Sequence, residues 1–255
     1  MTKSEIKSFA IAKALGGALF DLNKQSQMDR FLGSCERFAE IAFAFQDQKR
    51  VLDVGSEGAI LLSLLAELGH ECHAVDISGN ADEFPEVYRA KNIAFQNCNV
   101  EVDPLPFPDD YFDAVSCCQC LEHFTHSHLP AMREFHRVLK PGGILEADVP
   151  NVASLRNRWR LLRGKSITYD FEEHYLDAKP VEYRGSQFYP WRHNREFTKA
   201  ELELIFRRAG FRDIKAGFLL SNRVRFGIAR FKSLGSWLRG AIPSLRKSLI
   251  CFGTK

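Results

Sequence analysis

The sequence predicts an α/β protein with seven segments that read as strands. Three observations carry this prediction. Short apolar runs that end at glycine or at a carboxylate alternate with longer stretches of helical periodicity. Residues 51–76 read as strand, glycine turn, helix and strand, which is the repeating unit of such folds. A length of 255 residues with 45% hydrophobic content suits one α/β domain with additions.

The unit at residues 51–76 is the part around which the rest of the chain is organised. Its first strand, 51–54, stops at Gly55, and Gly55 and Gly58 form a turn before a helix over 59–68. Its second strand, 72–76, ends in Asp76, 21 positions after Gly55. In nucleotide-binding units of this kind the turn lets backbone approach the ligand, and the acid accepts hydrogen bonds from ribose hydroxyls.

The elements on either side of this unit define an N-terminal cap and a core. Residues 1–48 are predicted as a helical cap of two helices, 5–20 and 27–45, that covers one side of the sheet and of the ligand cleft. The core, 49–150, continues with strands at 93–98, 112–118 and 144–149. A proline-rich loop spans 103–110, and a helix over 129–139 ends at residues 140–143.

The C-terminal part divides into an insertion and a closing unit. Residues 151–197, rich in arginine and aromatic residues, show no clean periodicity and are predicted as a substrate-side insertion. In the unit 198–255, Thr198 and Glu201 form the capping box of a helix that runs through Ala209. Strands at 211–220 and 248–252 flank a basic amphipathic segment, 222–247, in which Pro243 ends or kinks the helix.

Charge and cysteine content narrow the class of protein. The net charge is +3, but the last acid is Asp213, so an acidic body precedes a basic tail, which suggests an anionic partner. No apolar stretch is long enough to span a bilayer. Seven scattered cysteines indicate reduced thiols in a cytoplasm. Cys117, Cys118 and Cys120 are expected to be small buried residues, and no metal site is predicted.

Five segments in fixed order then resemble a known family. They are Val51–Gly55, Val75–Asp76, Leu105–Asp113, Leu121–His123 and Arg137–Gly143, and together they cover residues 51–149. The chain is similar in them to class I S-adenosylmethionine-dependent methyltransferases. A second set, Arg192–Thr198 with Ala209–Phe211, resembles the branch found in bacterial and archaeal cell-surface glycan gene clusters.

The resemblance implies a doubly wound, mostly parallel sheet of seven strands with one antiparallel strand. It also implies S-adenosylmethionine as the cofactor, bound over the carboxyl ends of the first strands. Gly55 would lie under the methionine portion, Asp76 would hold the ribose, and Asn99 or Glu101 would lie near the adenine. The full set of expected cofactor-binding residues is Asp53, Gly55, Ser56, Gly58, Asp76, Ile77, Asn99, Glu101, Gln119 and Leu121. The chain departs from the family at Glu57 and Ala59, where glycines are usual.

Methyl transfer from a sulfonium is an in-line displacement for which the protein supplies proximity, together with a base if the acceptor is a hydroxyl. His123 is the first candidate for the base and His193 the second, and Glu122 could bind the substrate or orient a histidine. Each residue has a structural alternative. His123 would only shape the loop, His193 would only fix the helix that starts at Thr198, and Glu122 would only form structural hydrogen bonds.

Arg192 and Arg195 are candidates to hold a substrate carboxylate or phosphate by forked hydrogen bonds. Trp159 lies in a basic aromatic segment, 156–165, which either contacts a phosphate or is a solvated face paired with nearby acids.

Three candidate functions remain open at the level of sequence. The leading one is a cytoplasmic methyltransferase acting on an oxygen of a sugar or glycan precursor, including a lipid-linked one. The second is a small-metabolite or quinone-type methyltransferase, and the third is an inactive methyltransferase-fold partner protein, motivated by Glu57 and Ala59. The basic tail either contacts an anionic membrane or packs as a lid. The acidic body argues against nucleic acid.

Overall fold

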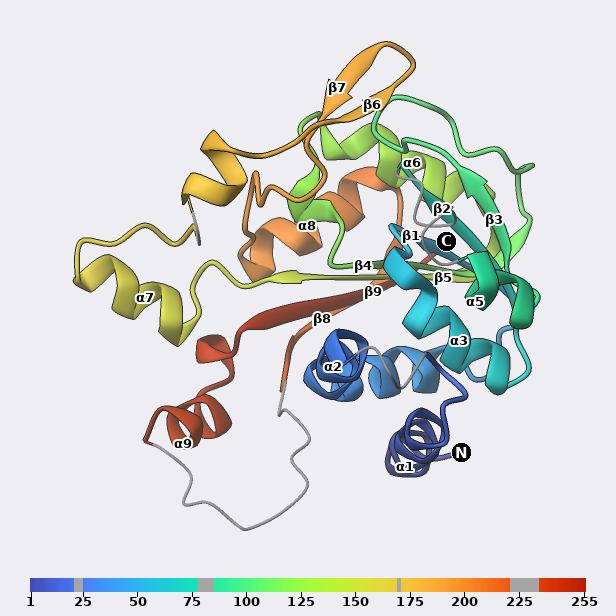
Figure 1. The fold of residues 1–255 in the computed structure, drawn as a ribbon, viewed down its shortest axis with the longest axis horizontal. Coiled ribbons are helices and arrows are strands. Elements are labelled where there is room, and N and C mark those ends of the chain that lie inside the picture. The colour runs from blue at the N-terminus through green and yellow to red at the C-terminus, as the bar shows by residue number, and fades with distance from the viewer. Residues whose placement is uncertain (21–24, 78–84, 169–170, 221–233) are drawn as a thin grey trace.

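The structure is a computed structural model that describes residues 1–20, 25–77, 85–168, 171–220 and 234–255. Its centre is a seven-stranded sheet in the order β3-β2-β1-β4-β5-β9-β8 (Figure 1). The strands are β1 Arg50–Val54, β2 Glu71–Asp76, β3 Ala94–Asn97, β4 Phe112–Cys118, β5 Leu139–Pro150, β8 Arg212–Leu219 and β9 Ser248–Thr254. The strands from β3 to β5 pair in parallel, and β9 runs antiparallel to both of its neighbours. The predicted sheet, including its single reversed strand, is confirmed.

Helices cover both faces of this sheet, as Figure 1 shows. On one face lie α1 Lys3–Leu15, α2 Gln25–Ala44, α3 Ile60–Glu67 and α5 Pro85–Ala90. On the other face lie α6 His128–Val138 and α8 Lys199–Ala209. In β1, Val51 packs into the first layer and Leu52 into the second, and both are fully buried. A strand with both faces covered has no solvent side, which explains its continuous apolar run.

The N-terminal helices lie under the sheet, but they do not reach the ligand cleft. The end of α1 is set by Gly16, whose N–H bonds back to Ala12 and Ala14, so this helix is five residues shorter than predicted at its C-terminal end. Among the residues that the structure describes, none from α1 or α2 lines the cavity at the carboxyl ends of the strands. The apolar faces of both helices are buried against α3 and the sheet, and cover of the cleft by the cap stays a prediction, because residues 21–24 between the helices lie outside the described residues.

The insertion at 151–197 has more regular structure than its sequence pattern indicates. It contains α7 Leu155–Leu162, a π-helical turn Glu172–Leu176 and a hairpin of β6 Val181–Tyr183 with β7 Ser186–Phe188. Arg184 and Gly185 both have positive φ, as a two-residue hairpin turn requires. The Tyr183 hydroxyl and the Arg184 guanidinium both bind the Asp103 carboxylate, which attaches the hairpin to the proline-rich loop.

Two local predictions have different outcomes. The capping box of α8 is confirmed, because Thr198 accepts from the Glu201 N–H and Glu201 accepts from the Thr198 N–H. The predicted terminator at 140–143 is instead part of β5, which begins at Leu139 because Leu139 pairs with Phe112 across a register shift.

The described part of the basic tail is short. Residues 221–233, half of the predicted amphipathic segment, lie outside the described residues. The next described element is α9 Leu234–Ala241, which ends before Pro243 as predicted. A 3₁₀ turn, Pro243–Leu245, follows it. Among the described helices, none has both the length and the apolar content needed to cross a bilayer.

Candidate active site

The turn after β1 brings two backbone segments into close contact at the edge of the sheet. Gly55 has φ +74° and its N–H donates to the carbonyl of Val75 at the end of β2. A Cβ at this position would lie 2.7 Å from the Sγ of Cys120, which follows β4. Only glycine fits there. The next two left-handed positions are Gly58 and Ala59, so the chain adopts the turn although Ala59 replaces a glycine.

A cavity of about 290 Å³ opens at this edge, over the carboxyl ends of the parallel strands. Four segments form its wall: the ends of β1 and β2, the residues after β3, the residues after β4, and the stretch that follows the β6–β7 hairpin. The lining residues are Val54, Gly55, Val75, Asp76, Ile77, Cys98, Asn99, Val100, Glu101, Cys118, Gln119, Cys120, His123, Phe124, Phe188, Tyr189, Pro190 and Trp191. This is where open α/β sheets bind their ligands.

Six of the ten residues expected to bind the cofactor line this cavity. They are Gly55, Asp76, Ile77, Asn99, Glu101 and Gln119. The other four lie outside the lining. Ser56 is buried and its hydroxyl bonds the Tyr88 hydroxyl, Gly58 shapes the turn, Leu121 belongs to the core, and Asp53 lies within the sheet.

The polar groups of the lining suit an adenosyl ligand. Asp76, only 8% exposed, ends β2 and supplies a carboxylate for ribose hydroxyls. The side-chain amide nitrogen of Asn99 is buried without a hydrogen-bond partner among the described residues, so it is a donor available to a base. Glu101 is already engaged, because one carboxylate oxygen accepts from the backbone N–H groups of Thr125 and His126.

Buried carboxylates lie beneath this cavity, in register across the sheet. Asp53 on β1 is level with Ser116 on β4, which is level with Glu146 on β5. Burial raises the pKa of Asp53 to about 8, and burial also raises the pKa of Glu146. The neighbouring Asp148 has a counter-charge, because the Arg37 guanidinium of α2 lies 2.8 Å from its carboxylate.

Asp148 in turn positions a lining residue. The side-chain amide of Gln119 donates to the Asp148 carboxylate at 2.6 Å, and its backbone N–H donates to the Asp148 carbonyl. Gln119, which directly follows β4, has φ +51°, and these two hydrogen bonds hold its left-handed backbone conformation. Arg37 is therefore linked to the cavity wall indirectly, because Asp148 binds both Arg37 and the lining residue Gln119.

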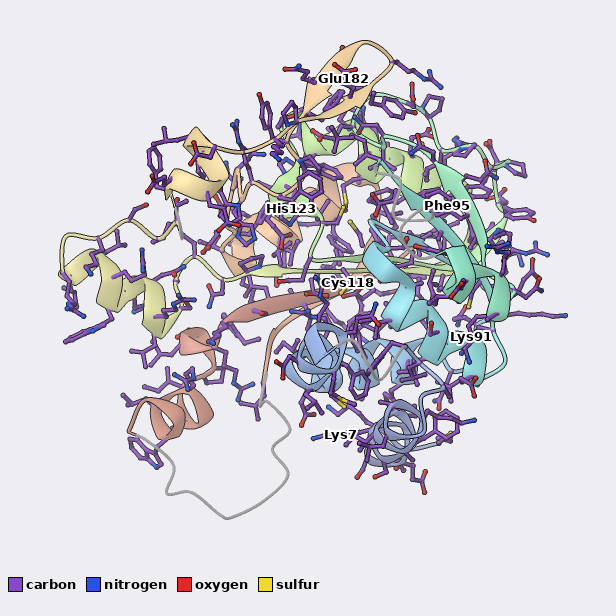
Figure 2. All side chains as sticks on the ribbon, in the orientation of Figure 1. Lys7, Lys91, Phe95, Cys118, His123 and Glu182 are labelled. Carbon is purple, nitrogen blue, oxygen red and sulfur yellow. The ribbon has the colours of Figure 1, made fainter. Side chains whose placement is uncertain are left out.

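Glu122, His123 and His193 converge at one side of the cavity. Figure 2 shows His123 on the side of the sheet that carries the β6–β7 hairpin. Its Nδ1 donates to the carbonyl of Arg192 at 2.9 Å, so in the neutral ring the lone pair is on Nε2. Burial, and then the nearby His193, lower the pKa of His123 to about 4. The two rings are 4.9 Å apart, centroid to centroid, at 80°.

A second cavity, of about 190 Å³, has a lining residue, His193, whose ring packs against His123 of the first cavity. His123 lines the first cavity and His193 lines the second, so the pair of rings stands between them. The second lining consists of Ile167, Thr168, His174, Tyr175, His193, Asn194, Arg195 and Glu196.

The predicted substrate residues have separate positions. Arg195 lines the second cavity and pairs with Glu201. Arg192 lines neither cavity: its guanidinium stacks 3.7 Å over the Tyr189 ring and donates to the carbonyl of His174. Trp159, on α7, is 60% exposed and lines neither cavity.

Sequence reasoning missed the aromatic edge of the first cavity, Phe188–Trp191, and the two residues His174 and Tyr175 in the second. The signal available was the aromatic run itself. Three aromatic residues around Pro190 in a segment without periodicity indicate an apolar surface outside regular structure.

Comparisons with known proteins agree with this geometry. The family model of the methyltransferase domain matches residues 25–216. The chain is 30% identical over 183 residues to the ubiquinone/menaquinone biosynthesis C-methyltransferase UbiE of Vibrio campbellii. That match covers 66% of this chain and 66% of the relative, slightly less than two thirds of its length.

Solved structures show the same fold. A SAM-dependent methyltransferase of Archaeoglobus fulgidus superposes with a TM-score of 0.58 at 19% identity, over 86% of this chain and 91% of that one. The PH0226 protein of Pyrococcus horikoshii superposes with a TM-score of 0.56 at 19% identity, over 95% and 97%. The chain therefore belongs to the methyltransferase domain family and has the fold of class I S-adenosylmethionine-dependent methyltransferases.

Proposed function

We propose that this protein transfers a methyl group from S-adenosylmethionine to an oxygen of a sugar or glycan precursor. The observation that carries the proposal is the second cavity, which has polar lining residues and whose His193 ring packs against His123 of the first cavity. Among the described residues that line it, Ile167 is the single aliphatic one. The hydroxyl, amide and charged side chains of this lining can form hydrogen bonds with a sugar in addition to those that they form within the protein.

The roles of the protein groups depend on their positions. Asp76 and Asn99 hold the adenosyl part of the cofactor in the first cavity, and the acceptor lies in the second cavity with one hydroxyl directed between the two rings. As the new O–C bond forms, the C–S bond breaks and the hydroxyl proton leaves. Nε2 of His123 carries a lone pair at this point and is the acceptor for that proton.

The test is methyl transfer by the purified protein from labelled S-adenosylmethionine to a panel of sugar nucleotides and glycan precursors. We expect a methyl ether on a sugar hydroxyl. His123→Ala should lower turnover by about 10²–10⁴-fold while affinity for S-adenosylhomocysteine is retained. Near-normal turnover of this variant would leave proximity as the main catalytic effect and would remove His123 as the base.

A second candidate is methylation of a quinone-type acceptor. Two observations favour it: the relatives named as ubiquinone/menaquinone C-methyltransferases, and the aromatic edge Phe188–Trp191 of the first cavity. The same assay with hydroxyquinone acceptors separates the two proposals. Transfer to a ring carbon, with no product from any sugar, would replace the first proposal with the second.

A lipid-linked acceptor would require contact with a membrane surface. Trp237 of α9 is 60% exposed and Arg239 lies in the same helix, whereas the guanidinium of Arg246 donates to carbonyls of the protein. An exposed tryptophan beside basic residues is typical of helices that lie on anionic bilayers. We therefore propose that the C-terminal segment brings the second cavity to a lipid-borne acceptor.

A further inference from the structure

Glu122 is a buried carboxylate without a partner among the described residues. Its side chain is inaccessible to solvent, and neither of its two oxygens has a hydrogen bond within the described protein. Its backbone carbonyl is satisfied, since it accepts from the N–H groups of Asn194 and Arg195. Buried carboxylates are normally paired with a cation or bound to a metal, because removing an isolated charge from water costs a great deal.

Two imidazoles meet this carboxylate from segments about 70 residues apart. One carboxylate oxygen of Glu122 and one nitrogen each of His123 and His193 all lie within 4.8 Å of one another. Around a tetrahedral ion with bonds of about 2.0–2.1 Å, such atoms are about 3.4 Å apart. A movement of about 1 Å in the side chains closes the set on an ion. The two rings, nearly perpendicular, then present one nitrogen each.

The surrounding hydrogen bonds hold the three residues in this arrangement. His123 donates its Nδ1–H to the carbonyl of Arg192, which leaves Nε2 to bind an ion and fixes the ring. The Asn194 side chain donates to the carbonyl of His123 at 2.7 Å, and the Tyr175 hydroxyl donates to the carbonyl of His193. The segment 192–194 is thereby fastened to the turn at 121–123.

Nearby cations are engaged elsewhere. The Arg37 guanidinium lies against Asp148, and Arg195 is paired with Glu201. Neither forms a hydrogen bond or an ion pair with the Glu122 carboxylate. Neither arginine therefore balances the charge of the Glu122 carboxylate, and an ion bound between the three side chains would supply the missing positive charge.

We propose that Glu122, His123 and His193 bind a divalent first-row transition-metal ion at the junction of the two cavities. Two imidazoles and one carboxylate suit Zn²⁺, Co²⁺ and Fe²⁺, and leave coordination positions open. Its catalytic role, unlike ion binding itself, rests on the proposed function. With the ion bound, Nε2 of His123 is a ligand, so the ion takes over the activation of the hydroxyl that Nε2 performs as a base in the ion-free site. The ion binds the acceptor hydroxyl, which releases its proton to water. The oxygen then attacks the methyl carbon, and the C–S electron pair passes to sulfur.

The test uses Co²⁺ as a spectroscopic probe of the full chain after chelator treatment, without cofactor or acceptor. We expect visible absorption bands that saturate at one ion per chain and disappear when Zn²⁺ is added. Glu122→Gln and His193→Ala should each weaken binding at least tenfold. His126→Ala is the matched control, because this exposed neighbour contacts Glu101 instead. Thermal unfolding shows whether each variant is folded.

Several results would overturn the site: no bands with the wild type, or unchanged affinity in Glu122→Gln and His193→Ala, or an equal loss in His126→Ala. The catalytic role has its own test. If the wild type binds Co²⁺ but the chelated protein methylates at the same rate, the ion has no part in transfer. If ion binding is confirmed and no sugar is methylated, the proposed function fails and the site stands.

Discussion

Asp76 is the residue whose function is most directly tied to its position. It ends β2, lines the first cavity and is 8% exposed. Replacing it with alanine removes the carboxylate that we expect to accept hydrogen bonds from the ribose hydroxyls of the cofactor. We expect Asp76→Ala to weaken binding of S-adenosylhomocysteine by about 1–3 kcal/mol, as measured by calorimetry.

The control for Asp76→Ala is Asp47→Ala, which removes an exposed carboxylate after α2, outside both cavities. It should bind with wild-type affinity. A folded Asp76→Ala protein that also binds as the wild type does would remove Asp76 from the site.

Asp53 is expected to make stability depend on pH. Its pKa is raised from 3.8 to about 8 by burial, so the folded protein keeps a proton that the unfolded chain releases. Between about pH 4 and pH 8 the wild type therefore loses stability as the pH rises, by about 1.4 kcal/mol per unit from this group. Asn has no such proton. We expect Asp53→Asn to gain stability relative to the wild type as the pH is raised from 5 to 8.

Urea unfolding at several pH values measures this difference. The pKa of Glu146 is raised by burial and in part by Asp53, so removing the Asp53 charge also reduces the loss of stability that Glu146 causes as the pH rises, which is a change in the same direction. Parallel pH profiles for the two proteins would contradict the assignment of a buried, neutral carboxyl to Asp53.

Among the elements, α2 is the one that joins the N-terminal layer to the cavity wall. Arg37 extends from this helix to Asp148 on β5, and Asp148 holds Gln119. Periodicity predicts the helix but not this contact, because it identifies the buried face and not the partner of a polar residue on that face. The role of α2 in the site is thus indirect.

We expect Arg37→Met to lower the free energy of unfolding by about 3–5 kcal/mol, because the carboxylate of Asp148 is left buried without its counter-charge. The measurement is urea or thermal unfolding at pH 7. The double variant Arg37→Met/Asp148→Asn should recover most of the loss, since a neutral amide oxygen still accepts from Gln119. No recovery in the double variant would show that Arg37 acts through packing alone.

For the whole molecule, the charge asymmetry predicts a preferred orientation toward an anionic surface. The nine basic residues after Asp213 lie beyond an acidic body, and α9 exposes Trp237 at this end of the chain. Each basic residue near such a surface contributes about 1 kcal/mol. We expect the wild type to co-sediment with anionic liposomes at low salt and to be released as salt is raised.

The variant for this experiment changes Arg225, Arg230, Lys232 and Arg239 to Gln and leaves β9 in place. It should remain in the supernatant, and neutral liposomes should retain neither protein. Three of these four residues lie outside the described residues, so the experiment tests their charge. A wild type that never sediments would mean that the tail is a packed lid and not a membrane contact.

The sequence by itself determined the sheet, the glycine turn, the acid at the end of β2 and the cap of α8. These features depend on neighbours within one helical turn or one strand, so the residue pattern contains them. Six of the residues expected to bind the cofactor line the cavity for the same reason, since each lies at the end of a strand of the sheet or shortly after it.

The tertiary structure decided which distant segments meet. Nothing local in residues 188–196 indicates that the hairpin and the loop after it lie against the turn at 121–123, or that His193 stands beside Glu122 and His123. Contacts between segments about 70 residues apart depend on how the two apolar layers of the sheet and the β6–β7 hairpin pack together. The physical reason is that short-range periodicity records which side of an element is buried, whereas the choice of partner is made by the packing of the whole chain.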